Sequence, residues 1–277
     1  MIEYKKNKIS LNRLSDILTV EDSEQSIDDK VTLNRIEEIR FSNVFFKYKD
    51  EFAIENLSLT VRTGKYYGII GENGSGKTTF IKLLLHLYNC DSGDITINNT
   101  SYDKLSFPII RANRQMVYIE DNPVTLFDDF DKNIILDSGK NTPHFTQTLN
   151  SSGLNEQYDT FVTKSAEELS AGQKQRVSLA RGFYHLKNET ILVLDEPFSA
   201  LDANAISLIQ DSIKRYKDKY HLTIFEITHN LSSMDRFDHI YYFENGKVLI
   251  EGTHKELMEN ENYVRYIQNY QSSHPVK

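Results

Sequence analysis

The sequence predicts an α/β fold built on a mixed, mostly parallel sheet. Three features predict it: strand-like and helix-like segments alternate along most of the chain, a glycine-rich loop joins an apolar segment to a helix, and apolar residues alternate in the first two strand-like segments. Alternation of strands with helices is typical of a parallel sheet covered by helices, whereas alternating apolar residues indicate half-buried strands.

Strands are expected first along the folded part of the chain. Apolar residues largely alternate in 39–48 and 52–61, and residues 66–70 form a continuous apolar run, YYGII, typical of a buried strand before a loop. Asn245-Gly246 lies between two apolar runs, which predicts a two-residue hairpin. Further strands are expected at 94–98, 116–120, 191–195 and 222–228, and helices at 144–152, at 171–185, after Leu201 and around 253–270.

The N-terminal residues differ from the rest of the chain. Leu11, Leu14 and Leu18 recur at helical spacing, which predicts a short amphipathic helix at 9–18 that packs on its own domain or on another one. Residues 19–30 are rich in acids and poor in apolar groups, so an extended, solvated linker is expected. The folded domain is therefore expected to start near residue 36.

Composition limits the classes of function. The chain has 277 residues and a formal net charge of −8 at pH 7, which does not favour broad nucleic-acid binding, and no nucleic-acid partner is expected. Cys90 is the single cysteine, so an internal disulfide is excluded and a reducing compartment is favoured. No apolar run approaches the roughly 20 residues of a membrane span, and residues 1–10 do not resemble a secretory signal.

Residues 71–79, GENGSGKTT, lie between the apolar strand and a predicted helix, as a phosphate-binding loop requires. Glycines permit backbone conformations that point successive N–H groups at phosphate oxygens, beside the positive end of the following helix. Lys77 is expected to contact the β- and γ-phosphates, and the Thr78 hydroxyl to bind Mg²⁺. The predicted nucleotide-binding residues here are Gly71, Glu72, Asn73, Gly74, Ser75, Gly76, Lys77, Thr78 and Thr79.

Two later strands end in polar residues that suit phosphate chemistry. The run ILVLDEP ends in Asp195, a candidate Mg²⁺ ligand through water, and Glu196, a candidate general base for an attacking water. The run LTIFEIT is followed by His229, which is suited to contact a γ-phosphate and hold that water. Without the phosphate loop, the acids would be interpreted as solvated at a strand end and the histidine as a structural hydrogen-bonding group.

Residues 169–176, LSAGQKQR, predict a helix start capped by Ser170 and suited to an anion. Together with the phosphate loop, ILVLDEP, SALD at 199–202 and His229, this segment resembles the motif set of the nucleotide-binding domain of an ATP-binding cassette (ABC) transporter. The resemblance implies a P-loop NTPase fold of the ABC-ATPase type over residues 36–277, with an antiparallel β subdomain and a helical signature subdomain.

The same resemblance assigns further residues. It implies that Tyr48 stacks on the adenine ring, and that ATP and Mg²⁺ are the cofactors. It also implies that two copies close head to tail on two ATP molecules, so that the signature segment of one faces the phosphate loop of the other. The residues it adds to the ATP site are Ser170, Gly172, Gln173 and Asp202.

Two segments resemble exporter-type domains, namely EQYDT at 156–160 and the C-terminal run at 246–268. In such exporters the cassette follows a transmembrane domain in the same polypeptide. The resemblance therefore implies that residues 1–35 are a lead-in from a transmembrane partner absent from this chain. It further implies an ATP-hydrolysing motor domain at the cytoplasmic face of the cell membrane that drives export.

Three positions depart from the family pattern. Glu120 stands where the family has a glutamine that contacts Mg²⁺, and it joins Thr78 and Asp195 as a predicted metal ligand that adds negative charge. Ala171 stands where the signature has glycine, and Lys164 where exporters carry a glutamate. Because the loop lysine, both acids of ILVLDEP and the histidine are present, a hydrolytically active site is expected.

Two other functions are compatible with the motifs. A soluble ABC ATPase acting on ribosomes or DNA is disfavoured. The family's soluble translation factors carry two cassettes in one chain, and its DNA-repair members carry a cassette split by coiled coils, whereas this chain has one uninterrupted cassette. A regulatory module that holds ATP with weak turnover is suggested by Glu120.

Overall fold

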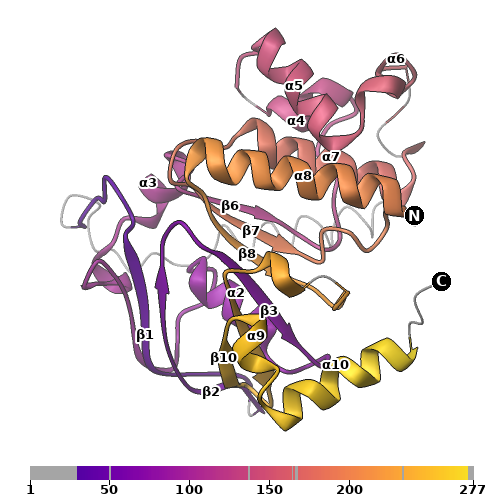
Figure 1. Cartoon of the computed structure of the whole chain (residues 1–277). Coiled ribbons are helices and arrows are strands. Elements are labelled where there is room, and N and C mark those ends of the chain that lie inside the picture. Colours follow the sequence, from indigo (N-terminus) through magenta and orange to yellow (C-terminus); the bar gives the residue numbers. More distant parts are fainter. Residues whose placement is uncertain are drawn as a thin grey trace, which may run out of the picture.

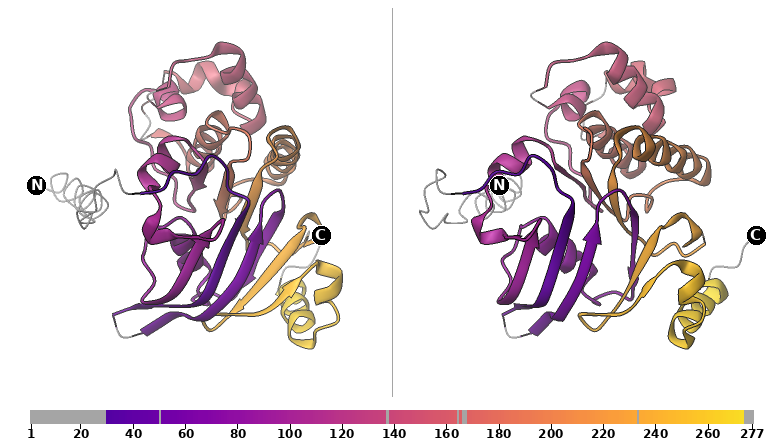
Figure 2. Two further views of the ribbon diagram at one scale, coloured as in Figure 1. Left: turned by 90° about the vertical axis from the view of Figure 1, so that its left-hand side faces the viewer. Right: turned by 60° about the vertical axis from the view of Figure 1, so that its left-hand side comes forward.

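The computed structural model describes residues 30–273 except positions 50, 137, 164, 166, 167 and 233. The predicted helix at 9–18, nearly all of the linker at 19–30, and Lys164 lie outside the described residues. The described chain forms two β-sheets, helices that cover them, and a separate group of helices at one end (Figures 1 and 2).

The first sheet is antiparallel and four-stranded, in the order β2-β1-β4-β5. Every second residue of the early part of β1 is buried, among them Ile39 and Phe41, because that face packs on the core. The three predicted strands of this sheet are confirmed, and the two-residue β5 is an addition. The strands are β1 (Glu38–Tyr48), β2 (Glu51–Arg62), β4 (Ser92–Ile97) and β5 (Thr100–Ser101).

The second sheet is six-stranded, in the order β10-β9-β3-β8-β7-β6, and mixed. Its strands are parallel except β10, which pairs antiparallel with β9 across the predicted Asn245-Gly246 turn. β3, β7 and β8 are buried at every position, which the apolar runs of β3 and β7 predict, whereas β8 also buries Glu226. The strands are β3 (Tyr66–Gly71), β6 (Met116–Ile119), β7 (Ile191–Asp195), β8 (Thr223–Ile227), β9 (His239–Glu244) and β10 (Lys247–Gly252).

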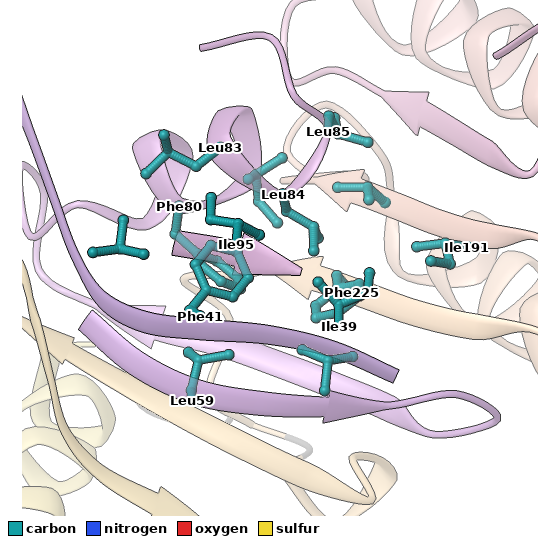
Figure 3. Close-up of a cluster of buried hydrophobic side chains, with 14 of the residues drawn as sticks. Ile39, Phe41, Leu59, Phe80, Leu83, Leu84, Leu85, Ile95, Ile191 and Phe225 are labelled. Atoms are coloured by element: carbon teal, nitrogen blue, oxygen red, sulfur yellow. The ribbon is translucent and has the colours of Figure 1, made fainter. Parts of the chain in front are cut away.

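Alternate residues of these buried strands face two different cores. Ile191 and Val193 of β7 join the core between the two sheets, whereas Leu192 and Leu194 face the helices on the other side. The first core contains Phe41 and the helix α2 (Lys77–Leu84), which lies between the sheets (Figure 3). Period-two alternation of a strand thus fixes the sheet between two apolar layers.

Helices cover the outer face of the six-stranded sheet (Figure 1). α7, α8 and α10 contribute apolar side chains to the second core, among them Phe183, Ile209 and Tyr263. These helices, which the sequence predicted, are α7 (Ala171–Tyr184), α8 (Ala203–Tyr220), α9 (His254–Leu257) and α10 (Glu261–Ser273).

A group of helices packed against one face of α7 has its own small apolar core. The predicted helix at 144–152 is confirmed, whereas α3, α4 and α6 are additions, because helices of four to six residues carry too little periodicity to read from sequence. The members are α4 (Phe130–Ile135), α5 (Thr142–Ser152), α6 (Tyr158–Phe161) and α7, whereas α3 (Phe107–Ala112) packs near β6.

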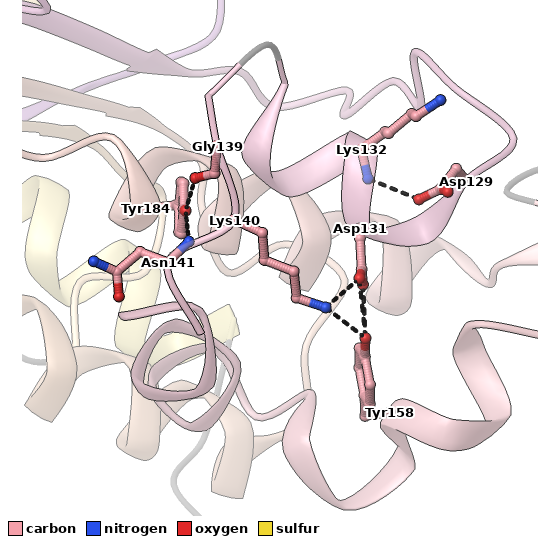
Figure 4. Close-up of polar contacts among 8 residues, drawn as sticks. All are labelled: Asp129, Asp131, Lys132, Gly139, Lys140, Asn141, Tyr158 and Tyr184. Carbon is pink, nitrogen blue, oxygen red and sulfur yellow. Dashed lines mark hydrogen bonds and ion pairs between the residues drawn. The ribbon is translucent and has the colours of Figure 1, made fainter. Parts of the chain in front are cut away.

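Polar contacts hold this helical group together (Figure 4). Lys140 Nζ lies 2.6 Å from Asp131 Oδ2, and the Tyr158 hydroxyl donates to the same carboxylate at 2.9 Å. The Tyr184 hydroxyl of α7 donates to the Gly139 carbonyl at 2.8 Å. The resemblance predicted an antiparallel β subdomain, a mixed core sheet and a helical subdomain, and all three are confirmed.

Candidate active site

The carboxyl ends of β3, β7 and β8 meet at one edge of the six-stranded sheet. Asp195, the last residue of β7, pairs with Ile227, the last residue of β8, which also pairs with Ile69, two residues before the end of β3. The phosphate loop follows β3, Glu196 follows β7 and His229 follows β8. The sheet therefore brings together three segments that lie far apart in the sequence.

Two positions of the phosphate loop require glycine. Gly71 has φ +143°, and a Cβ there would lie 2.2 Å from the Phe243 carbonyl oxygen. Gly76 has φ +103°, and a Cβ there would lie 2.6 Å from the Ala53 carbonyl oxygen. Both positions combine a left-handed backbone with a close approach of another strand, which only glycine tolerates.

Lys77 is the first residue of α2 and points back across the loop. Its Nζ donates to the Gly71 carbonyl at 2.9 Å and to the Glu72 carbonyl at 2.7 Å. Burial lowers the pKa of Lys77, and the charges of Glu196 and Asp195 oppose that shift. The ammonium is thus held at the centre of the loop.

The loop also carries polar groups that suit a phosphate. The Ser75 hydroxyl is buried and has no hydrogen-bond partner within the described part of the chain. No side chain caps the start of α2, whose N-cap residue is Gly76. An unpaired buried hydroxyl and uncapped backbone N–H groups, beside a lysine, fit the oxygens of a bound phosphate chain.

Glu196 and His229 face each other across the strand ends. His229 Nε2 lies 3.1 Å from Glu196 Oε1, and each side chain is about one third exposed, at 37% and 36%. Burial and the charge of Lys77 lower the pKa of His229, whereas Glu196 opposes the shift. The pair can therefore share a proton or hold one water molecule at the mouth of the loop.

A cavity of about 330 Å³ joins these groups. Its walls come from the β1–β2 hairpin, the phosphate loop, the start of α2 and the ends of β7 and β8. Glu51, Phe52 and Ala53 of β2 also line it, and sequence reasoning missed them because the hairpin carries no motif. The predicted site residues in its lining are Tyr48, Asn73, Gly74, Gly76, Lys77, Thr78, Thr79, Glu196 and His229.

Tyr48 lines this cavity from the end of β1. Its ring is packed edge-on against Phe46 and Tyr88, with ring centroids 4.9 and 5.7 Å away, and 43% of the residue is exposed. The Thr79 hydroxyl donates to the Tyr48 hydroxyl at 3.5 Å. A fixed ring with a free face is suited to stack on an aromatic base.

The three predicted metal ligands differ in their surroundings. Thr78 is exposed on the cavity, whereas Asp195 is buried and accepts a hydrogen bond from the Tyr118 hydroxyl at 3.1 Å. Burial raises the pKa of Asp195 to about 6. Burial also raises the pKa of Glu120, and the Arg181 charge opposes that shift.

These oxygen donors fit Mg²⁺, which takes one or two carboxylates and keeps several waters. A complete protein cage is absent, since the described residues contain no group of three or more His, Cys, Asp or Glu able to hold a metal ion. Tyr118 and Arg181 were not predicted. Tyr118 could have been found, because it lies two residues before Glu120 in the strand predicted at 116–120, where the two side chains would share a face.

The signature segment lies away from this cavity. Ser170 caps α7: its hydroxyl accepts from the Gln173 N–H at 3.3 Å, and the Gln173 side chain accepts from the Ser170 N–H at 2.9 Å. Neither residue is among the described residues that line the cavity, and Ser170 is exposed. The helix start is thus pre-formed and faces outward.

Gly172 and Asp202 connect this helix to the segment after β7. A Cβ at Gly172 would lie 2.7 Å from the Ala200 carbonyl oxygen, so the segment 199–202 runs close beside the helix start. Asp202 caps α8 by accepting from the Ala205 N–H at 2.9 Å, and its carboxylate lies 3.2 Å from Arg176 of α7. Within one chain, therefore, Asp202 has a structural role.

Comparison with known proteins identifies the family of this chain. Residues 54–199, more than half of the chain, match the sequence model of the family described as ABC transporter. The chain belongs to the ABC transporter family. The matched region runs from within β2 to the segment beside the signature helix, and so includes the phosphate loop and both acids at the end of β7.

Relatives in this family cover most of the chain. An ABC transporter B family member 13 of Arabidopsis thaliana is 32% identical over 250 residues, which are 86% of this chain and 19% of that protein. The alpha-hemolysin translocation ATP-binding protein of Escherichia coli is 30% identical over 281 residues, 98% of this chain and 39% of that protein. The chain spans about a fifth to two fifths of the length of these curated relatives.

A solved structure supports the fold. A bacterial Atm1-family ABC exporter with ATP bound matches 99% of this chain and 48% of its own, with a TM-score of 0.82 at 22% sequence identity. None of the described helices has the length and apolarity of a membrane span.

Proposed function

We propose that this chain is the ATP-hydrolysing motor domain of an ABC exporter. The observation that carries the proposal is the Glu196–His229 pair, 3.1 Å apart, at the mouth of a glycine-rich loop that centres a lysine. Phosphate oxygens of ATP would lie on the loop N–H groups and Lys77, and the adenine ring would stack on Tyr48. Mg²⁺, held by Thr78 and Asp195 with Glu120 nearby, would neutralise phosphate charge.

Glu196 would act as the general base. The attacking water forms a bond to the γ-phosphorus as the bond to the β–γ bridging oxygen breaks, and the proton of the water passes to Glu196. His229 would hold the water and contact the γ-phosphate, a role that its lowered pKa favours because the neutral ring can accept as well as donate. Lys77 would stabilise the charge of the phosphate oxygens.

The outward-facing signature segment supports a dimer. Ser170, Gly172 and the N-terminus of α7 form a pre-built anion site that lies away from the chain's own cavity. A second copy arranged head to tail would complete each site with this segment, and Gln173 and Asp202 would lie at the same junction. ATP would then bias the closed state because it contacts both copies only there.

Export is supported by the relatives. They include the alpha-hemolysin translocation protein and an ATP-dependent lipid A-core flippase 2 of Colwellia psychrerythraea, which is 32% identical over 265 residues. Residues 1–35 would then be a lead-in from a transmembrane domain, residues 36–277 the nucleotide-binding domain, and the cytoplasmic face of the cell membrane its location.

The test of the general base is Glu196→Gln. This variant should lose at least 10²-fold in kcat and keep ATP affinity within about threefold, since the amide retains the shape but not the basicity. Glu189→Gln is a matched control, because Glu189 lies just before β7 and pairs with Arg35 at 3.0 Å, at the opposite end of the strand. Turnover near the wild-type rate in Glu196→Gln would overturn the assignment.

A further inference from the structure

The last helix, α10, packs beside the loop that carries His229. Tyr263 and Ile267 of α10 are buried in the same apolar core as Leu231, two residues after the histidine. Next to this contact, the Tyr270 hydroxyl donates to Asn230 Oδ1 at 3.2 Å. A side chain far along the sequence thus reaches the residue that follows His229.

Asn230 is fixed by several hydrogen bonds. Its Oδ1 also accepts from the Ser232 N–H at 3.1 Å and from the Ser232 hydroxyl at 2.6 Å. Its own N–H donates to the Thr228 hydroxyl oxygen at 3.1 Å. The two neighbours of His229 are therefore linked to each other, and the Asn230 side chain connects this turn to α10.

α10 also forms a wall of a second cavity, of about 500 Å³, which lies behind the Glu196–His229 pair. Tyr266, Asn269 and Tyr270 line it together with Glu196 and His229. Glu72 of the phosphate loop lines the same cavity. The helix thus borders a cavity that is also lined by the phosphate loop and by the segment carrying His229.

We infer that Tyr270 is a positioning residue for His229 and acts through the side chain of Asn230. This inference rests on the proposed role of His229. The imidazole sits on a short turn after β8, where the described residues give it one polar contact, Glu196, and a shift of the turn would move it away from the water it holds. Misplacement of a catalytic group by about 1 Å can cost up to 10² in rate.

Tyr270→Phe removes only the hydroxyl and keeps the ring. The full chain carrying this change should lose about tenfold in kcat for Mg²⁺-dependent ATP hydrolysis, while its Kd for ATP stays within twofold. Only kcat is expected to change, because the substitution leaves the phosphate loop and Tyr48, the proposed nucleotide-binding groups, unaltered.

Tyr263→Phe is the matched control. It removes a hydroxyl from the same helix, one that contacts His254 at 2.8 Å and does not reach the His229 turn. Its kcat should stay within twofold of wild type even if its unfolding midpoint falls further than that of Tyr270→Phe. An equal loss of kcat in both variants would show a general effect of α10 stability and overturn the inference.

The variant Asn230→Ala tests whether Tyr270 acts through the Asn230 side chain. If Tyr270 acts through Asn230, the double variant should be no slower than Asn230→Ala alone. Multiplicative losses, or an unchanged kcat in Tyr270→Phe, would overturn the inference. His229→Ala separates the positioning role of Tyr270 from the catalytic role of His229. If kcat falls strongly in His229→Ala but not in Tyr270→Phe, only the positioning role is refuted. If His229→Ala keeps the wild-type turnover, the role of His229 is refuted, and the inference with it.

Discussion

At the scale of single residues, burial separates groups that the sequence presents as equivalent. Asp195 and Glu196 are adjacent acids, yet Asp195 is only 4% exposed whereas the Glu196 side chain is 36% exposed and faces His229. Desolvation raises the pKa of Asp195 to about 6, and a cation bound beside it would favour its charged form. The buried acid therefore suits a metal and the exposed one suits proton transfer.

Glu120 allows a direct test at this scale. In the proposed site its carboxylate would add negative charge near the γ-phosphate; burial raises the pKa of Glu120, and the Arg181 charge opposes that shift. Glu120→Gln should therefore raise kcat about two- to fivefold at saturating Mg²⁺ and ATP, measured as steady-state phosphate release. Asp211→Asn, a change at an exposed acid of α8, is the control and should stay within twofold. A slower Glu120→Gln enzyme would show that turnover needs the carboxylate.

At the scale of elements, a buried ionic contact joins strand β8 to the turn that follows the His229 loop. Glu226 of β8 is fully buried, accepts a hydrogen bond from the Tyr66 hydroxyl of β3, and lies 2.6 Å from Arg236. The Arg236 guanidinium also lies over the Phe237 ring, 4.3 Å from its centroid. The Glu226 carboxylate thus joins β3, β8 and the turn at 234–236.

Removing the acid of this contact should be costly. Glu226→Gln removes the negative charge that lies 2.6 Å from the Arg236 guanidinium, whose side chain is only 15% exposed, and the free energy of unfolding should fall by about 3 kcal/mol. Urea unfolding followed by circular dichroism measures this. Glu38→Gln breaks the exposed pair with Arg40 and should change stability by less than about 0.5 kcal/mol. Equal, small effects in both variants would contradict a stabilising role for the buried contact.

At the scale of the whole molecule, the fold depends on histidines that are neutral when buried. Burial, with the charge of Arg114, lowers the pKa of His185 to about 4, and burial with the charge of Arg111 does the same for His86. In the unfolded chain both would titrate near 6.5. The unfolded state therefore binds more protons between pH 6.5 and 4, and stability falls as the pH falls through that window.

The pH dependence can be assigned by substitution. Asp195 acts with the opposite sign, because its raised pKa lets the folded state bind a proton first as the pH falls through 6. The test therefore compares variants: between pH 7 and pH 5, His185→Gln should lose about 1–2 kcal/mol less than the wild type in urea unfolding, since glutamine gains no proton. An identical loss in the two proteins would show that His185 does not contribute.

Much of the architecture was predictable because its signals are local. The continuous apolar run YYGII indicates a strand buried on both faces, and the alternating residues of 39–48 indicate a strand buried on one. The Asn245-Gly246 pair itself favours a two-residue turn. The short helix α4 was not predictable. It is fixed by Asn133, whose buried side chain accepts from the Leu126 and Phe127 N–H groups at 2.6 and 3.1 Å, contacts that no periodicity encodes.

The sequence by itself determined the family, the order of elements and the identity of the phosphate loop, because glycine conformations and strand burial are imposed by neighbouring residues. Only the tertiary structure decided which distant residues act together. It brought Glu196 within 3.1 Å of His229, set the Tyr118 hydroxyl on Asp195 and placed Tyr270 of the last helix on Asn230. The physical reason is that parallel strands separated by long crossovers align their carboxyl ends, and that alignment is a property of the sheet and not of any one segment.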